Sequence, residues 1–375
     1  MKQLKLVLTL ILGLALSMSS WAQTIEERLD AIEEALASES GGGGHAGHGH
    51  GSGGKTSIGG YGELHYNAGD DGGTQDRVDI HRFVLFFGHE YNDDVKFFSE
   101  FEIEHSLACA DEDDCPGEVE MEQMYVDVNY GNGLHTQYGV FLIPVGILNE
   151  THEPDTFYGV ERNRVEARII PTTWWEAGVK WTKDQGNGLT LDAAIHSGME
   201  IPTTGVVRSG RQKVAQAETN NFAYTARVKK SRPGLEMAFT YHNQTDAYQS
   251  RQDSELGATL MSAHVDWTRG PWSVQALIAE WSLDNPTLEA AGRGSTEGHY
   301  LTVSYKLNDQ WGIFARYETL DEQAGNANAT AEFTNTFGFN YWIHPQVVLK
   351  ADFQSERPDS GNDDDIMHLG FGYSF

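Results

Sequence analysis

The stretch MHLGFGYSF, residues 367–375, closes the chain, and its side chains alternate between two kinds. Met367, Leu369, Phe371, Tyr373 and Phe375 are large and apolar, whereas the residues between them are small or polar. In a β-strand this alternation places one kind of side chain on each face. An apolar face, a polar face and a terminal aromatic residue are typical of the last strand of a membrane β-barrel.

The first 22 residues have the layout of a secretory signal peptide. Lys2 and Lys5 precede an apolar run over residues 6–16, and Ala22 offers a cleavage site after a small residue. The apolar run is shorter than the roughly 20 residues that a membrane-spanning helix needs. We therefore expect an exported protein from which residues 1–22 are removed.

The composition is strongly acidic. The chain has 55 Asp and Glu against 26 Lys and Arg, a formal net charge of −29 that falls to −31 once the signal and its two lysines are removed. This charge argues against nucleic acid as a partner, because phosphates would be repelled. The mean hydropathy of −0.46 suits a barrel, in which only every second strand residue meets lipid.

The region before the barrel divides into a helix and a linker. Residues 23–40 predict a short coiled-coil helix, with apolar residues spaced four, three and four apart at Ile25, Leu29, Ile32 and Leu36. Two heptads are too short to associate alone, so we expect a trimer clasp held by the barrels, with a single solvated helix as the alternative. Residues 41–54 predict a flexible glycine-rich linker. Its histidines are weak candidates for metal binding, because glycine gives them no fixed geometry: His45, His48 and His50.

Residues 55–375 predict one all-β domain, a sixteen-stranded antiparallel transmembrane β-barrel. Alternating segments of about ten residues, the length of a tilted spanning strand, start near residues 58, 78, 95, 118, 134, 174, 188, 221, 234, 257, 271, 297, 311, 332, 346 and 365. The spacers between them alternate between long and short, eight long and seven short. A barrel of sixteen antiparallel strands whose chain starts and ends on the same side of the membrane requires eight connections on the other side and seven on its own side.

The two faces can be assigned strand by strand. Leu301, Val303 and Tyr305 oppose polar neighbours, and the polar set is predicted to face a water-filled lumen. The strand near residue 118 is ambiguous, because its glutamates share parity with apolar residues. Tryptophans near strand ends predict an aromatic girdle: Trp174, Trp175, Trp181, Trp267, Trp272 and Trp311.

The longest spacer, residues 144–173, is the third long loop and carries both apolar anchors and many charges. We expect it to fold inward against the wall and narrow the pore, with a solvated extracellular lid as the alternative. The candidates for the constriction are Glu150, His152, Glu153, Asp155, Glu161, Arg162, Arg164, Glu166 and Arg168.

The predicted lumen wall is close to neutral. Its charged members include Arg82, Lys96, Glu100, Glu102, Glu104, Lys180, Arg227, Lys229, Arg316 and Lys350. The glutamate row at 100, 102 and 104 indicates either a cation-attracting stripe or a row neutralised by Arg82 and Lys96. Charge counting leaves the ion preference open.

Cys109 and Cys115 are the only cysteines and lie in one long spacer of an exported chain. They predict a disulfide, with zinc binding by the two thiols and nearby acids as the weaker alternative, since thiols beyond the inner membrane tend to be oxidised. The sequence has none of the common hydrolase or phosphate-loop motifs, so we expect neither an enzyme nor a cofactor.

Several stretches resemble the phosphate-selective porin O and P family. They are GYGELHYN (60–67), HRFVLFFGHEYNDDVKFFSEFEIEH (81–105), GEVEMEQMYVDV (117–128) and GVFLIPVGILNETHEPDTFYGVERNRVEARIIPTTWWEAGV (139–179). The resemblance covers residues 60–180 well and the remainder in patches.

The resemblance implies a homotrimeric outer-membrane porin, in contact with lipid, whose third loop folds inward. It implies passive diffusion of small hydrophilic solutes, with anions such as phosphate preferred. The family's ladder of arginines and cluster of lysines has no counterpart that we can place here. A pore preferring cations or metal complexes therefore stays open, as does an envelope tether that uses the barrel as its anchor.

Overall fold

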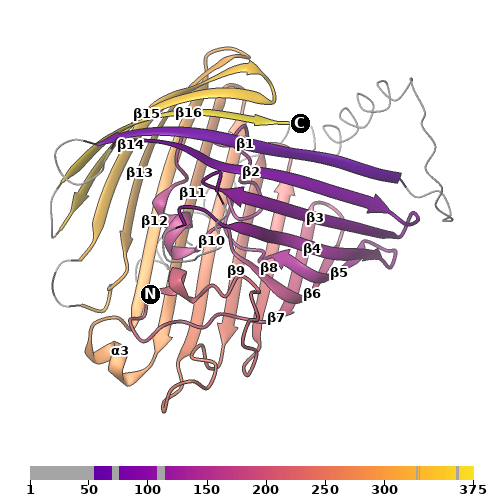
Figure 1. Cartoon of the computed structure of the whole chain (residues 1–375), viewed down its shortest axis with the longest axis vertical. Coiled ribbons are helices and arrows are strands. Elements are labelled where there is room, and N and C mark those ends of the chain that lie inside the picture. Colours follow the sequence, from indigo (N-terminus) through magenta and orange to yellow (C-terminus); the bar gives the residue numbers. More distant parts are fainter. Residues whose placement is uncertain (1–54, 70–75, 108–114, 327, 329, 360–362) are drawn as a thin grey trace.

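The computed structural model describes residues 55–375 except 70–75, 108–114, 327, 329 and 360–362 (Figure 1). The predicted signal peptide, coiled-coil helix and linker, with His45, His48 and His50, lie outside the described residues. So does Cys109, and the disulfide stays a prediction.

Sixteen strands form a closed barrel in which every strand pairs with its neighbours in the sequence and the first pairs with the last (Figure 1). The strands are β1 (Lys55–Gly69), β2 (Arg77–Glu90), β3 (Val95–Glu104), β4 (Val119–Asn129), β5 (Leu134–Leu142), β6 (Trp175–Asp184), β7 (Leu189–His196), β8 (Ala223–Arg232), β9 (Leu235–Gln244), β10 (Gly257–Arg269), β11 (Trp272–Asp284), β12 (Ser295–Lys306), β13 (Trp311–Asp321), β14 (Glu332–His344), β15 (Val347–Pro358) and β16 (Asp364–Ser374). The predicted sixteen-stranded antiparallel barrel is confirmed, and each predicted strand start lies within three residues of the observed one.

Long and short connections alternate around the barrel and define its two ends. At the short-turn end, Gly131, Asn132 and Gly133 all have positive φ angles, of 77°, 53° and 72°. Glycine and asparagine tolerate this left-handed region, which is why they occur in such turns. Both ends of the barrel sequence also lie at the short-turn end, because β1 starts there and β16 returns to it.

The barrel wall is apolar outside and polar inside, the reverse of a water-soluble protein. Leu301 and Phe337 are 45% and 57% exposed, whereas their neighbours Thr302 and Thr336 are 5% and 3% exposed. Alternation along β-strands produces this separation directly. An exposed apolar band of this kind is what a lipid bilayer covers in transmembrane barrels.

The seam between β1 and β16 closes the barrel. Their pairing runs from Tyr61 opposite Ser374 to Gly69 opposite Ile366. Beyond it, the Phe375 amide donates to the Gly60 carbonyl at 2.9 Å, and the Gly60 amide donates to the Phe375 carbonyl at 3.0 Å. The alternating segment seen in the sequence is therefore the closing strand, and its backbone pairing with β1 extends to Phe375.

Two β-bulges change which side chains face inward. In β2, Arg82 pairs with Glu63 and Ile80 with Leu64, which leaves His81 as the extra residue. In β4 the register shifts in the same way around Glu122, which is 2% exposed. A bulge re-aims the side chains on either side of it. This explains why period-two reasoning left the strand near residue 118 ambiguous.

The connections also contain short helical turns. They are η2 (Val165–Ile169), a π-helical turn, η3 (Val207–Gly210), a 3-10 turn, and α3 (Pro286–Ala290). Within the described ranges, no helix has the length and apolarity needed to cross a membrane.

Candidate functional site

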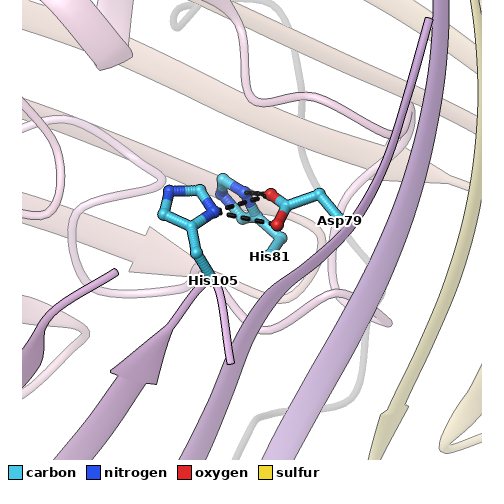
Figure 2. A group of neighbouring side chains, drawn as sticks. All are labelled: Asp79, His81 and His105. Carbon is cyan, nitrogen blue, oxygen red and sulfur yellow. Dashed lines mark hydrogen bonds and ion pairs between the residues drawn. The ribbon is translucent and has the colours of Figure 1, made fainter. Parts of the chain in front are cut away.

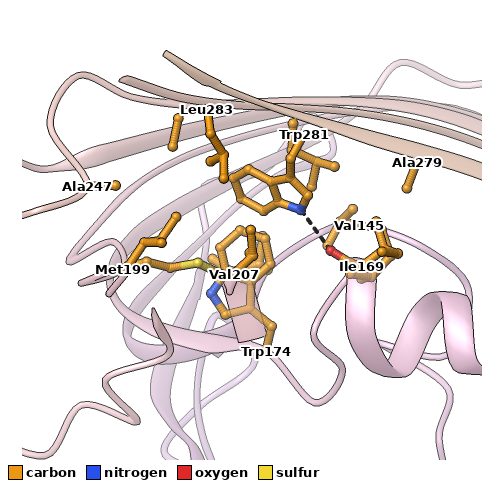
Figure 3. Packing of buried hydrophobic residues seen from close by; sticks show 14 of the residues in the cluster. Val145, Ile169, Trp174, Met199, Val207, Ala247, Ala279, Trp281 and Leu283 are labelled. Carbon is orange, nitrogen blue, oxygen red and sulfur yellow. Dashed lines mark hydrogen bonds between the residues drawn. The ribbon is translucent and has the colours of Figure 1, made fainter. Parts of the chain in front are cut away.

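The connection between β5 and β6, residues 143–174 (the β5–β6 segment), packs its apolar side chains against buried residues of the wall. Ile169 and Trp174 belong to a buried cluster that includes Trp281 of β11 (Figure 3). The Trp281 indole donates to the Ile169 carbonyl at 2.7 Å. The β5–β6 segment is therefore held against β11 by both apolar contact and a hydrogen bond.

Two of the tryptophans assigned to the aromatic girdle are buried. Trp174 is 0% and Trp175 is 3% exposed, and the Trp174 and Trp281 ring centroids lie 5.9 Å apart. The girdle assignment is wrong for these two, because Trp174 ends the β5–β6 segment and Trp175 starts β6, at the point where the segment returns to the wall. Trp272 and Trp311, at 49% and 38% exposed, lie on the outer surface as predicted.

Glu166 holds the fold of the β5–β6 segment together. Its carboxylate accepts hydrogen bonds from the amides of Ile147 at 2.8 Å and Leu148 at 2.7 Å, and from the Tyr300 hydroxyl of β12 at 2.7 Å. The side chain is 0% exposed, and burial raises its pKa against the opposing effect of these hydrogen bonds. Glu166 was predicted to face the constriction, and the structure places it inside the segment instead.

Asn149, which sequence reasoning missed, clips the two ends of the segment together. Its side-chain amide donates to the carbonyls of Ile143 at 2.8 Å and Trp174 at 3.0 Å, and its oxygen accepts from the Trp174 amide at 2.7 Å. A single asparagine among charged residues gives no sequence signal for this role.

The middle of the segment reaches strands far around the barrel. Arg316 of β13 donates to the Tyr158 carbonyl at 2.6 Å, and the Val160 amide donates to Asp352 of β15 at 2.6 Å. Both Arg316 and Asp352 are buried on the polar face of the wall. The segment that joins β5 and β6 thus contacts β13 and β15.

Wall glycines allow this close approach. A Cβ atom on Gly370 would lie 3.0 Å from the Val160 side chain, and one on Gly372 would lie 2.8 Å from Pro154 Cγ. Real Cβ atoms avoid contacts this short. The two glycines of β16, which appear in the sequence as ordinary small residues, therefore mark where the Val160 and Pro154 side chains of the segment pack closely against the wall.

Glu150 joins the segment to β8 through Arg227. The Arg227 guanidinium contacts Glu150 and also donates to Asp192 at 2.8 Å. Burial by itself would raise the pKa of Glu150, but the charge of Arg227, aided by Lys180 and Lys229, holds it at about 2. Glu150 is therefore a charged anchor at neutral pH.

His152 joins the segment to the acidic side of the wall. Its Nε2 atom lies 3.4 Å from Glu100 and 3.5 Å from Glu122, which are ion-pair rather than strong hydrogen-bond distances. Burial disfavours the imidazolium, yet these two carboxylates raise the pKa of His152 well above its ordinary value. His152 is buried, like Glu166, and does not face open solvent.

Glu161 connects the segment to β1. It lies 3.0 Å from His65 Nδ1 and accepts a hydrogen bond from the Asn67 amide at 3.0 Å. Burial would raise the pKa of Glu161, but these two partners hold it below its usual range. His65 also contacts Glu63, which receives a hydrogen bond from Arg82 at 2.5 Å.

The arginines of the segment differ in their partners. Arg164 pairs with Glu332 and, at 3.0 Å, with Glu356, and Arg168 pairs with Glu322. Among the described residues, the Arg162 guanidinium has one hydrogen bond, to the Thr173 hydroxyl at 2.9 Å, and no ion pair.

The two remaining constriction candidates are half-buried. The Asp155 carboxylate accepts from the Ser374 hydroxyl at 3.0 Å, and the Glu153 side chain makes no hydrogen bond or ion pair with any described residue.

An acidic patch lines β3 and β4. Carboxylate oxygens of Glu102, Glu104 and Glu120 lie within 4.8 Å of one another, beside the buried Glu100 and Glu122. Lys213, from the connection between β7 and β8, pairs with Glu120 and Glu118. Of the two predicted neutralising residues, Arg82 hydrogen-bonds Glu63, and Lys96 pairs with Glu90 at 2.8 Å near the short-turn end.

Other charged wall residues lie against aromatic rings or carboxylates. Lys350 Nζ lies 3.6 Å from the ring centroid of Phe157, and Lys180 Nζ lies 5.5 Å from that of Phe141. Lys229 lies 3.5 Å from Glu236. These residues contact either the wall or the β5–β6 segment.

The connection between β7 and β8 braces the β5–β6 segment. Arg208 donates to the Thr172 carbonyl at 2.9 Å, and Arg211 donates to the Thr173 carbonyl at 2.5 Å. Burial, with the nearby charge of Arg211, lowers the pKa of Arg208 to about 10.

This chain is similar to known proteins both in sequence and in structure. An uncharacterised protein of Aquifex aeolicus (strain VF5) is 31% identical over 351 residues, which cover 85% of this chain and 80% of that protein. The trimer form of in-vitro folded OmpT, an outer membrane protein of Vibrio cholerae, is similar in structure, with a TM-score of 0.57, 11% identity and coverage of 86% of this chain and 100% of that one. Salmonella typhi OmpF in complex with daunomycin gives a TM-score of 0.62 at 12% identity, covering 85% and 97% of the two chains. No family model matches. The structural likeness shows a shared porin-like barrel fold.

Proposed function

We propose that this chain, which belongs to the same family as the Aquifex aeolicus protein, is an outer-membrane porin for passive diffusion of small hydrophilic solutes. The observation that carries the proposal is the closed sixteen-stranded barrel with an apolar outer face and a polar inner face. A barrel of this strand number is wide enough to enclose water. We assign the chain no enzymatic activity.

The β5–β6 segment is the proposed filter, an inward-folded third loop. Its contacts with β1, β11, β13 and β15 support this role, because they draw the segment across the polar side of the wall. The partly exposed charges are the ones that would meet a solute: Glu150, Glu153, Asp155, Glu161, Arg162, Arg164 and Arg168. Buried His152 and Glu166 would instead hold the filter in shape.

A preference for cations is the favoured selectivity. The glutamates of β3 and β4 are concentrated on one side of the wall, and Arg164 and Arg168 are compensated by carboxylates. In a narrow passage with low-dielectric walls, such a patch raises the local concentration of cations. An anion such as phosphate is the competing candidate, supported by the resemblance to the phosphate-selective porins and by Arg162, which has no ion pair among the described residues.

The test is the reversal potential of the reconstituted barrel in a potassium chloride gradient. We expect the reversal potential of the wild type to have the sign of a pore that prefers potassium. A triple variant with Glu102, Glu104 and Glu120 changed to Gln should shift the reversal potential toward that of a chloride-preferring pore. A matched control removes three exposed loop charges, at Asp253, Glu255 and Glu289, and should change it little. A chloride-preferring wild type would favour the anion pore, and a folded barrel without current would favour the envelope tether.

A homotrimer in the outer membrane, as in the trimer form of the Vibrio cholerae protein, is part of the proposal. Light scattering of the purified barrel in detergent measures the assembly mass directly, and a monomer at micromolar concentration would contradict it.

A further inference from the structure

Three side chains that no constriction or wall prediction included meet at the long-loop end of the barrel. They are Asp79 and His81 of β2, and His105, which directly follows β3 (Figure 2). His105 Nδ1 lies 2.9 and 2.8 Å from the two carboxylate oxygens of Asp79, and His81 Nδ1 lies 3.4 Å from Asp79 Oδ2. Each imidazole therefore directs its Nδ1 atom toward the Asp79 carboxylate.

The backbone is shaped to bring these side chains together. His81 is the extra residue of the β2 bulge, so it departs from the alternation that turns its neighbour Ile80 outward, 44% exposed. His105 has a positive φ angle of 51°, and its amide donates to the His81 carbonyl at 3.3 Å. A left-handed conformation is uncommon for a residue other than glycine and is enriched at functional sites.

We propose that Asp79, His81 and His105 bind a divalent transition-metal ion, of which zinc is the best probe. Metal–ligand bonds of about 2.0 to 2.2 Å require neighbouring ligand atoms to lie about 2.9 Å apart at right angles and about 3.4 Å apart in a tetrahedron. The carboxylate-to-imidazole distances of 2.8 and 3.4 Å span these values. All three ligand atoms lie within 4.8 Å of one another.

The donor set selects the class of ion. Two imidazoles and one carboxylate suit zinc, copper, nickel and iron, whereas magnesium and calcium prefer oxygen ligands. Three protein ligands leave coordination positions for water or for a group on a passing solute.

The site is held in place yet open to solvent. The side chains of Asp79, His81 and His105 are 29%, 33% and 36% exposed, so an ion can enter from the long-loop end. The His81 ring stacks on His65, with centroids 4.6 Å apart and planes 11° from parallel. His65 contacts Glu63 and Glu161, so it supports His81 and leaves the three ligands free to bind.

The competing explanation is a hydrogen-bonded cluster in which two imidazoles donate to Asp79 and no ion binds. A histidine–aspartate pair without a metal-site geometry serves for comparison. His135 Nδ1 lies 3.1 Å from Asp127, and among the described residues this pair belongs to no group of three potential metal ligands. The two explanations predict different zinc stoichiometries.

The experiment measures zinc binding to the full-length barrel in detergent by calorimetry. Three linker histidines, at 45, 48 and 50, are first replaced by Ala to remove a background of weak sites. We expect one zinc ion per chain with micromolar or tighter affinity. Asp79→Asn, His81→Phe and His105→Asn should each weaken binding by at least about tenfold, the size of effect that even outer-shell losses cause.

The variants are chosen to preserve structure. Phe at position 81 retains stacking on His65, and Asn at position 105 tolerates the left-handed backbone. His135→Asn is the control and should leave zinc binding unchanged. Absence of stoichiometric binding in the linker variant, or equal loss in the His135 control, would overturn the proposal.

Binding is measured without reference to conductance, so the result is independent of the porin proposal. A barrel that conducts but binds no zinc would refute the metal site alone, and one that binds zinc but passes no current would refute the pore alone.

Discussion

Glu166 offers a direct test of how the β5–β6 segment is held. Replacement by Ala removes the acceptor for the Ile147 and Leu148 amides and for the Tyr300 hydroxyl. Taking about 1 kcal/mol as the net contribution of each of the three hydrogen bonds gives a total of about 3 kcal/mol. This corresponds to a change of roughly 150-fold in the equilibrium between the closed segment and locally opened states.

Hydrogen exchange read by mass spectrometry is the appropriate assay. Protection of the Ile147 and Leu148 amides reports local opening directly, and we expect it to fall by about two orders of magnitude in Glu166→Ala. Glu166→Gln retains one carbonyl oxygen for these amides and should lose less. Glu153→Ala is the control, because that carboxylate makes no hydrogen bond within the described ranges. Unchanged protection in a folded Glu166→Ala barrel would refute the assigned role of Glu166.

Two further predictions concern acid and the wall glycines. The Arg227 anchor lowers the folded-state pKa of Glu150 to about 2, below the unfolded value of about 4.3, so its stabilisation is present above pH 4.3 and is lost as the pH falls through 2. Channel recordings should therefore show increased current fluctuation only near pH 2, and Glu150→Gln should show it at pH 7; a wild-type change centred above pH 4 would contradict this. Gly372→Ala should destabilise the barrel by about 1 to 3 kcal/mol in guanidinium unfolding, because the added methyl group overlaps Pro154. Gly370→Ala, where the Val160 side chain at 3.0 Å can shift, should cost less, and equal stability of both variants with the wild type would argue against the close approach.

The barrel could be predicted from sequence because strand alternation and spacer length each constrain it independently. Few folds other than a membrane barrel combine an apolar residue at every second strand position with eight long and seven short spacers. Bulges break the parity on which this reasoning depends, and so the inward positions of His81 and Glu122 could not be predicted.

The interior was harder to predict, because the partner of a charged residue depends on a contact distant in sequence. Arg164 and Glu332 are 168 residues apart, and nothing local to either one indicates the pair. Trp174 and Trp175 were assigned to the girdle from their position near a strand end. That position alone does not show whether a side chain faces lipid or is covered by a neighbouring loop, here the β5–β6 segment. Asn149 was missed for the same reason, since its partners belong to both ends of the segment that it clips.

The contacts of the β5–β6 segment with the seam have a consequence for the order of assembly. Asp155 accepts from the Ser374 hydroxyl, Pro154 passes over Gly372, and Glu161 reaches His65 of β1. These partners come from the first and last strands to be synthesised, so the segment cannot complete its contacts until the cylinder has been closed. A chain truncated before its final strand would therefore expose residues 143–174 to protease, and protection of that segment would report that the barrel has closed.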